Sequence, residues 1–273
     1  MPFLELGSID TVKKKRDLAS CLRLSETHSK VNISILSKDS IWERTLIETS
    51  GGNLIPLLVH RSKIKNAKYV LIVHGEGKSA VPISVVNKYI DEDYGVILAD
   101  LYGIGEQASN ESEKLDRTLP RFHTLSRSLL WLGTTLMGQW VEEVGIIRTV
   151  MEEEFDAEEV HLVGFKETGI AALLAGTLYS GVDSFTVYDT PTSFVFDGTE
   201  KLGFYDMSLH VPGILPWGDV MLAAAICNAP VKFVNPRSAS GRLLTAKEIS
   251  SEKGVYCKMS RLLGNSCDII EFD

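Results

Sequence analysis

The chain has 273 residues, of which 44% are hydrophobic and 23% are charged, and its formal net charge at pH 7 is −8. This length is enough to bury a sizeable core within one large domain. The acidic balance excludes a nucleic-acid partner, because a nucleic-acid surface needs clustered Lys and Arg. The one basic run, at residues 13–16, is typical of a solvated helix face.

Membrane and export signals are missing from the sequence. No apolar stretch reaches the roughly 18 residues of a membrane helix, and the N-terminus has no signal-peptide core. We therefore expect no membrane partner, and either a cytoplasmic protein or a mature or excised fragment of an exported one. The cysteines, at positions 21, 227, 257 and 267, lack C-x-x-C spacing and are expected to be free, buried thiols.

The first third of the chain predicts a helical lead-in followed by strands. Residues 1–40 are predicted as a lead-in helical segment, because Leu18, Cys21, Leu22 and Leu24 have helical spacing. Residues 42–48 and 54–60 alternate apolar and polar side chains around a turn, which predicts an antiparallel hairpin. Residues 65–67 are a short loop. Buried strands are expected at 69–74 and 95–100, with a helix at 81–89 between them.

From residue 69 onward, strands and helices alternate. Residues 101–128 have the composition of a loop, and 129–154 predicts one or two helices. The later expected elements are strands at 160–164, 184–189, 231–235 and 268–272, helices at 167–180, 217–228 and within 245–263, and an irregular segment at 190–213. Alternation of this kind predicts the α/β class, with a mostly parallel central sheet and helices on both faces.

A functional site is expected at the carboxyl ends of these strands, where ligands of parallel sheets bind. The ends lie at residues 75–78, 100–106, 165–168, 189–193 and 236–241. The candidate ligand-binding residues there are Gly75, Glu76, Asp100, Lys166 and Glu167.

Residues 160–174 form an apolar run, a tight turn and an Ala/Leu-rich helix. This pattern is typical of a nucleophile elbow, in which Gly-x-Ser-x-Gly lifts a Ser above the sheet. Lys166 stands where that Ser belongs, and Thr168 stands where the closing glycine belongs. An elbow backbone is strained by about 1–3 kcal/mol because the chemistry needs it, so an unstrained Lys166 would indicate that the chemistry has gone.

The chain resembles the acetylxylan-esterase-like branch of the α/β-hydrolases. The resemblance covers most of the chain and is carried by the order and spacing of residues 16–24, 51–58, 73–78, 99–106, 132–139, 163–173 and 211–215. It implies the α/β-hydrolase fold and three catalytic residues, which are a Ser at the elbow, an acid after strand 231–235 and a His after the last strand. Here the elbow carries Lys166, residues 236–241 contain no carboxylate, and no His follows His210.

The resemblance therefore implies a degenerate domain in which no catalytic residue is expected. Such a domain would act as a structural or ligand-binding module. The whole chain is interpreted as one hydrolase-like domain, or as one half of a longer two-domain protein. The expected partners are a catalytic esterase domain or an acylated polysaccharide fragment.

Two alternatives stay open. In the first, the chain is an active carboxylester hydrolase with a rearranged set, Ser79 or Ser193 with His123 or His210 and Asp189. In the second, Lys166 is an amine nucleophile, which needs a lowered pKa, whereas a neighbouring Glu167 would favour the charged amine.

The remaining site predictions concern anions, cofactors and metals. The turn at residues 74–77 resembles an oxyanion turn, whose backbone N–H could hold a small anion together with the N–H of Glu167. A Gly-rich turn after a strand is equally what chain geometry requires. We expect no cofactor, because Gly103-Ile104-Gly105 lacks the third glycine and following helix of a dinucleotide site. We expect no metal, because no His or Cys pair has ligand spacing.

Overall fold

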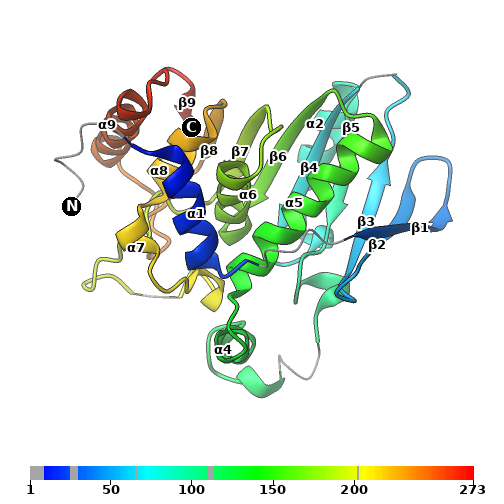
Figure 1. The fold of residues 1–273 in the computed structure, drawn as a ribbon, viewed down its shortest axis with the longest axis horizontal. Helices are drawn as coiled ribbons and strands as arrows, with labels where there is room; N and C mark the ends of the chain where they lie inside the picture. The colour runs from blue at the N-terminus through cyan, green and yellow to red at the C-terminus, as the bar shows by residue number, and fades with distance from the viewer. Residues whose placement is uncertain (1–8, 25–29, 65–66, 110–113, 202) are drawn as a thin grey trace.

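The computed structural model describes residues 9–24, 30–64, 67–109, 114–201 and 203–273 (Figure 1). A sheet of nine described strands runs through it in the order β1-β2-β3-β5-β4-β6-β7-β8-β9. The strands are β1 (Val31–Lys38), β2 (Glu43–Thr49), β3 (Leu54–His60), β4 (Lys68–His74), β5 (Gly95–Ala99), β6 (Glu159–Phe165), β7 (Ser184–Tyr188), β8 (Val231–Val234) and β9 (Ile270–Phe272).

The sheet is antiparallel at one end and parallel over the rest. The strands β1, β2, β3 and β5 pair antiparallel with their neighbours in turn. The pairs β5–β4, β4–β6, β6–β7, β7–β8 and β8–β9 are parallel. The predicted mostly parallel sheet and the predicted N-terminal antiparallel hairpin, β2–β3, are both confirmed.

Helices cover both faces of the sheet, as predicted. On one face, α2 (Ile83–Asp91) packs Val86 and Tyr89 against Val70 and Ile72. The opposite face of the sheet carries a larger core. In Figure 1, α5 and α6 lie in front of this face. The other helices are α1 (Thr11–Leu22), α4 (His123–Trp131), α5 (Leu136–Phe155), α6 (Glu167–Leu178), α7 (Ile214–Trp217), α8 (Val220–Cys227) and α9 (Ala246–Leu263), with 3₁₀ turns η1 (Lys78–Ala80), η2 (Gly105–Gln107) and η3 (Met207–Leu209).

Several predicted bounds were wrong. The lead-in segment 1–40 is not helical throughout, because α1 ends at Leu22 and residues 31–38 form β1. Ile33 and Ile35 alternate with polar residues there, and Ile33 pairs with Ile47 of β2, so the period is that of a strand. The predicted loop 101–128 contains η2 and the start of α4, and the predicted helix 217–228 begins only at Val220. Residues 1–8, 25–29 and 65–66 of the predicted lead-in and short loop lie outside the described residues.

The turn from β6 into α6 keeps the strained backbone of an elbow. Lys166 has φ 54° and ψ −122°, a conformation that a non-glycine residue rarely adopts. A Cβ on Gly164 would lie 2.4 Å from the Cα of Gly169, and one on Gly169 would lie 2.1 Å from the Oγ1 of Thr190. The turn is therefore packed too tightly for side chains at either glycine. The condition that would have indicated lost chemistry, an unstrained Lys166, is not met.

Thr168 replaces the closing glycine of the elbow without opening it. Its hydroxyl donates to the carbonyl oxygen of Val73 at 2.9 Å and accepts from the N–H of Phe165 at 3.1 Å. The side chain is fully buried. These bonds join the elbow to β4 and to the end of β6. A glycine at this position would allow the turn but make no side-chain bonds, whereas Thr168 stabilises it.

Glu143 is a carboxyl buried in the core beneath the loop that follows β5. Its side chain is 2% exposed, and its Oε2 accepts from the N–H of Tyr102 at 2.6 Å. Burial raises the pKa of Glu143 to about 8, although this hydrogen bond opposes the shift. The folded protein therefore keeps a proton there that the unfolded chain releases.

The strain at Lys166 is measurable by comparing two substitutions. Glycine normally costs about 0.5–1 kcal/mol relative to alanine, but here it relieves strain of about 1–3 kcal/mol. Both variants lose the Lys side chain. We therefore expect Lys166→Gly to be more stable than Lys166→Ala by about 1 kcal/mol in urea unfolding. At the exposed helical position Lys88 we expect the alanine variant to be more stable than the glycine variant. If Lys166→Ala were also more stable than Lys166→Gly, the backbone at Lys166 would be unstrained.

The stability of the protein should depend on pH through Glu143. The folded pKa lies above the unfolded value, so this carboxyl lowers stability as pH rises from about 4.5 to about 8, by roughly 1.4 kcal/mol per unit at most. Glu143→Gln cannot ionise, so we expect it to gain stability over the wild type as pH rises across that window. Urea unfolding at pH 5 to 8 measures this gain, with the exposed Glu153→Gln as the charge-matched control. A gain that is the same at every pH would contradict the prediction.

Candidate functional site

Four strand ends bring charged side chains together beside the elbow. The Nζ of Lys166, after β6, lies 2.6 Å from the Oε1 of Glu76, after β4. The guanidinium of Arg237, after β8, donates twice to the Oδ1 of Asp189, after β7, at 2.8 and 2.6 Å. The ring of Phe204 lies between the two pairs, with its centroid 5.3 Å from the Lys166 amine and 4.4 Å from the Arg237 guanidinium. The site is thus an aromatic ring flanked by two ion pairs.

Lys166 is engaged rather than free. Its hydrogen bond to Glu76 is the main reason that the pKa of Glu76 lies below its usual value, and burial opposes that shift. The side chain of Lys166 is only 29% exposed. An amine held in an ion pair is a poor starting point for a Schiff base, which needs the uncharged form.

The backbone groups of the predicted oxyanion turn are already bonded within the chain. The N–H of Glu76 donates to the Nδ1 of His74 at 3.0 Å. The N–H of Glu167 lies close enough to the carboxylate of its own side chain to favour the charged form. The Oε1 of that carboxylate also accepts from the N–H of Asp206 at 2.6 Å, and its Oε2 lies 3.2 Å from where a Cβ on Gly75 would stand. A buried carboxyl of the protein itself therefore occupies the space beside the turn.

Glu167 has an unusual environment for a residue at the elbow. It is 2% exposed, and burial raises its pKa to about 7. Burial likewise raises the pKa of Asp206, while nearby Arg121 opposes that shift. Arg121 donates to the carbonyl oxygen of Gly75 at 2.6 Å and lies 3.9 Å from Asp206, so it joins the turn to the segment that carries Asp206.

His74 is the imidazole that lies at this site, and the sequence analysis did not single it out as a base. Burial lowers its pKa, and Glu76, Lys166, Arg121 and Asp189 are the charged neighbours that act on it. Its Nδ1 accepts a backbone hydrogen bond, and its ring contacts Phe165 with centroids 5.0 Å apart. These contacts hold the ring between the turn and the end of β6.

Asp100 closes two neighbouring loops. Its carboxylate accepts from the backbone N–H of Lys78 at 2.6 Å and of Glu106 at 2.9 Å, and it pairs with the Lys78 amine. The carboxylate packs so closely that a Cβ on Gly105 would lie 2.2 Å from it. Every hydrogen bond that the Asp100 carboxylate makes among the described residues is internal to these loops, which favours a structural role for this side chain.

The alternative catalytic set is not brought together. Ser193 donates to the Oδ2 of Asp219, and Ser79 is exposed in η1. His123 is the first residue of α4, and His210 is exposed after η3. Among the described residues no hydrogen bond joins either serine to either histidine, and Asp189 is paired with Arg237 instead.

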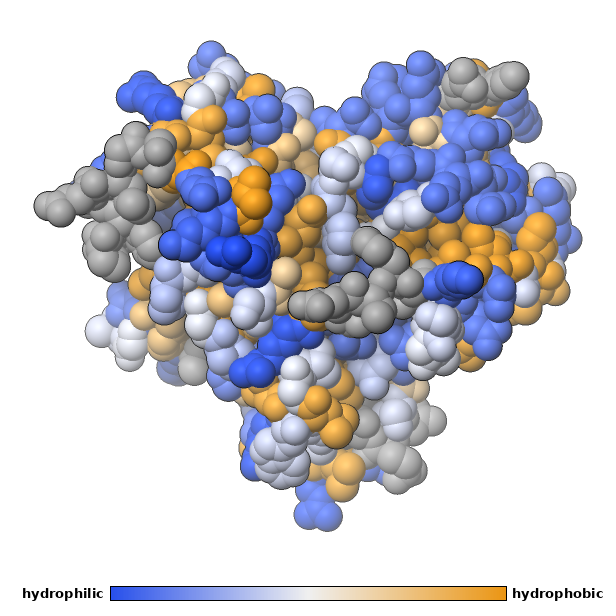
Figure 2. All heavy atoms as spheres, viewed as in Figure 1, coloured by the Kyte–Doolittle hydropathy of each residue, from blue (hydrophilic) through white to orange (hydrophobic). Residues whose placement is uncertain are grey.

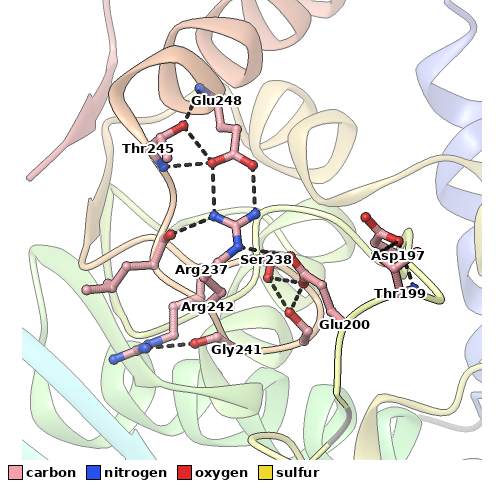
Figure 3. A network of polar contacts seen from close by, with 11 residues as sticks. Asp197, Thr199, Glu200, Arg237, Ser238, Gly241, Arg242, Thr245 and Glu248 are labelled. Carbon is pink, nitrogen blue, oxygen red and sulfur yellow. Dashed lines mark hydrogen bonds and ion pairs between the residues drawn. The ribbon is translucent and has the colours of Figure 1, made fainter.

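The segment after β8, where the resemblance expects the acid, is held by a network of polar contacts (Figure 3). Glu200 reaches it from the long segment after β7, accepting from the hydroxyls of Ser238 and Ser240 and from the Nε of Arg242 at 2.9 Å. Arg242 also binds Glu248 of α9 through two nitrogens, at 3.1 and 2.7 Å. Glu200 and Asp189 are the carboxylates that reach this segment, and both bond to hydroxyls or guanidinium groups rather than to an imidazole.

The described part of the chain carries no metal cluster, no membrane-spanning helix and no disulfide. It contains no group of three or more His, Cys, Asp or Glu side chains able to hold a metal. No described helix is long and apolar enough to cross a membrane. The four cysteines are free thiols, as predicted, but each is half-buried rather than fully buried.

Sequence reasoning found Lys166 and Glu76 but missed several residues that complete the site. Arg121, Phe204 and Asp206 lie in segments that were predicted as loop or irregular, where no periodicity marks a side chain. The sequence shows that residues 236–241 lack the expected carboxylate, but it does not show that Arg237 lies at the position of that acid. An arginine at a strand end, facing an aspartate at the end of the preceding strand, is the one signal that could have indicated the Arg237–Asp189 pair.

Comparison by sequence gives no relative. No protein-family model matches the chain, and a search of curated proteins finds no match.

Comparison by structure places the fold. A protein assigned as an acetyl xylan esterase, from Bacteroides fragilis, matches with a TM-score of 0.70 at 12% identity, over 96% of this chain and 73% of that one. A glucuronoyl esterase from Solibacter usitatus matches with a TM-score of 0.59 at 14% identity, over 93% and 81% of the two chains. Acetyl xylan esterase 1 from Thermoanaerobacterium sp. matches with a TM-score of 0.53 at 14% identity, over 86% and 83%. The chain therefore has the α/β-hydrolase fold, and its structural neighbours include acetyl xylan esterases and other esterases with that fold.

Proposed function

We propose that this chain is a catalytically degenerate α/β-hydrolase domain, related to carbohydrate esterases, that acts as a structural or ligand-binding module. The observation that carries the proposal is the ion pair between Lys166 and Glu76 at the elbow. The position that the fold reserves for a nucleophile thus holds an engaged cation instead.

The acid position supports the same conclusion. A working triad needs a carboxylate there to orient an imidazole. The chain has Arg237 there, bonded to Asp189 and to the carbonyl oxygen of Gly241. A cation in this place would repel the imidazolium that forms during acyl transfer.

One hydrogen bond between a serine hydroxyl and a histidine does occur among the described residues, between Ser184 at the start of β7 and His161 inside β6. The other ring nitrogen of His161 bonds to the hydroxyl of Thr186 rather than to a carboxylate, and neither Ser184 nor His161 lies at a carboxyl strand end. General-base activation of a nucleophile at the elbow therefore has no visible route.

The oxyanion contacts are a third support. Stabilising a developing oxyanion needs N–H donors that point at empty space. The N–H of Glu76 is bonded to His74, the N–H of Glu167 acts on its own carboxyl, and that carboxyl fills the space beside Gly75. A substrate oxygen would have to displace this carboxyl before it could be held.

The partners we propose are a catalytic esterase domain or an acylated polysaccharide fragment. An exposed sheet edge favours the first. Strand β1 is an edge strand, and its Ile35 and Leu36 are 56% and 61% exposed. Figure 2 shows hydrophobic residues gathered at the β1–β3 end of the molecule. An unpaired edge with apolar side chains is a common docking surface for another polypeptide.

Hydrolysis assays test this proposal. We expect the full chain to turn over p-nitrophenyl acetate and acetylated xylan no faster than buffer. We also expect Lys166→Ser alone to restore no activity, because an oriented base and its acid are missing as well. Release of p-nitrophenol and of acetate measures both, with Lys166→Ala as the matched variant that also removes the ion pair.

Two outcomes would replace the proposal with an alternative. Turnover that Ser79→Ala or Ser193→Ala abolishes would establish an active hydrolase with a rearranged set. Borohydride trapping of a carbonyl substrate that is lost in Lys166→Ala would establish covalent chemistry at the lysine.

A further inference from the structure

A cavity lies away from the elbow, between α1, α7, α8 and α9. Its volume is about 350 Å³, within the range of roughly 300–1,000 Å³ typical of small-molecule sites. Most of its wall is apolar, and Met221 and Met259 can adapt to the shape of a ligand. The apolar wall includes Leu215, Met221, Leu222, Val255, Met259 and Leu262.

Two carboxyls line this apolar cavity, and only one of them has partners. Asp219 caps the N-terminus of α8 and accepts from the N–H of Val220, the N–H of Phe194 and the hydroxyl of Ser193. Glu252, on α9, makes no hydrogen bond and no ion pair among the described residues. A half-buried carboxyl without a partner at an apolar wall is costly unless something supplies the opposite charge.

The electrostatics around Glu252 are negative. Burial raises its pKa to about 7, and the neighbouring charges of Asp219 and Glu248 act in the same direction. Lys14, on α1, is the cation in the described wall, and its amine donates to the carbonyl oxygen of Trp217 and lies 5.8 Å from the Trp217 ring centroid. Lys14 is thus held by α7, and it is not among the charges that act on Glu252.

We propose that this cavity binds a small amphiphile with an apolar body and a primary amine head, whose ammonium group pairs with Glu252. The apolar body replaces water against Met221, Val255 and Met259. A carboxylate head is disfavoured, because it would face the two carboxyls of the cavity wall, Glu252 and Asp219. The site is independent of the elbow and of any hydrolytic activity.

Proton linkage gives this pairing a signature. The bound ammonium favours ionised Glu252, so binding releases a proton wherever Glu252 is protonated in the free protein. The amine itself stays charged up to about pH 10. Affinity should therefore rise from pH 6 to pH 8, by up to about tenfold for each unit below the pKa of Glu252. The other ionisable groups near this carboxyl are Asp219 and Glu248, whose charges act on it, and Lys14 in the cavity wall, and all three are retained in every variant below.

Calorimetric titration of the full chain with n-octylamine, 1-octanol and octanoate tests the proposal, because these probes share one body and differ in the head. We expect n-octylamine to bind at least about tenfold more tightly than octanoate at pH 8, and to bind more weakly at pH 6. Glu252→Gln should weaken the amine by about tenfold and leave 1-octanol unchanged. The exposed Glu153→Gln, with the same loss of charge, should change neither.

The other outcomes would overturn the proposal. They are no binding by any of the three probes, tightest binding by octanoate, equal binding of amine and alcohol, or amine binding that survives Glu252→Gln. Val255→Trp, which fills the cavity, should abolish binding of the amine and the alcohol alike, and retained binding in that variant would place the probes elsewhere. Thermal unfolding of each variant verifies that it is folded, and Glu252→Gln decides the question if the bulky variant is not.

Discussion

The tight contact between the elbow and its neighbouring strands is the constraint on which the site depends. The N–H of Lys166 donates to Tyr188 of β7 at 2.8 Å, and its carbonyl oxygen accepts from the hydroxyl of Thr190 at 3.0 Å. On the other side, Thr168 is bonded to β4. The backbone at position 166 is therefore fixed by the sheet itself, whatever side chain it carries. This explains why the strained conformation persists with a lysine in place of a nucleophile. Strain at such a position reports the packing of the fold, and activity has to be argued from the side chains.

Those side chains form a chain of alternating charge along the carboxyl edge of the sheet. Glu76 and Lys166 join the ends of β4 and β6, and Asp189 and Arg237 join the ends of β7 and β8. Phe204 links the two pairs through its contacts with both cations. These two ion pairs would compete with catalysis. On the function proposed here, their role is to hold together the loops that follow β4, β6, β7 and β8. Exposed ion pairs contribute little each, but in both of these pairs the cation is largely buried and lies near the same aromatic ring.

The sequence predicted those parts of the fold that depend on local pattern. Strands β4 and β5 are continuous apolar runs because both of their faces are buried, and the elbow is marked by its own glycine and helix. Strand β1 was missed because its alternation lies next to a helical pattern in a segment with mostly exposed side chains. The partners of Lys166 and Arg237 lie 90 and 48 residues away, so no local pattern could identify them. The cavity beside α9 could not be predicted from any local pattern either, because it depends on how four helices pack against one another.

The environment of Glu167 brings these points together. A helix N-terminus favours negative charge, and in an esterase of this fold the first N–H groups of the elbow helix act on the developing oxyanion. Here the side chain of Glu167 itself lies beside the start of this helix, where its own N–H favours the charged form and the N–H of Asp206 donates to it. Its pKa of about 7 means that the carboxyl is not firmly ionised, because burial opposes the charge that the backbone would stabilise. The positive end of the elbow helix therefore acts on a carboxyl of the protein itself, that of Glu167. On the function proposed here, a serine at position 166 would still lie beside the buried Glu167 carboxyl, so residue 167 would contribute to the loss of activity together with residue 166.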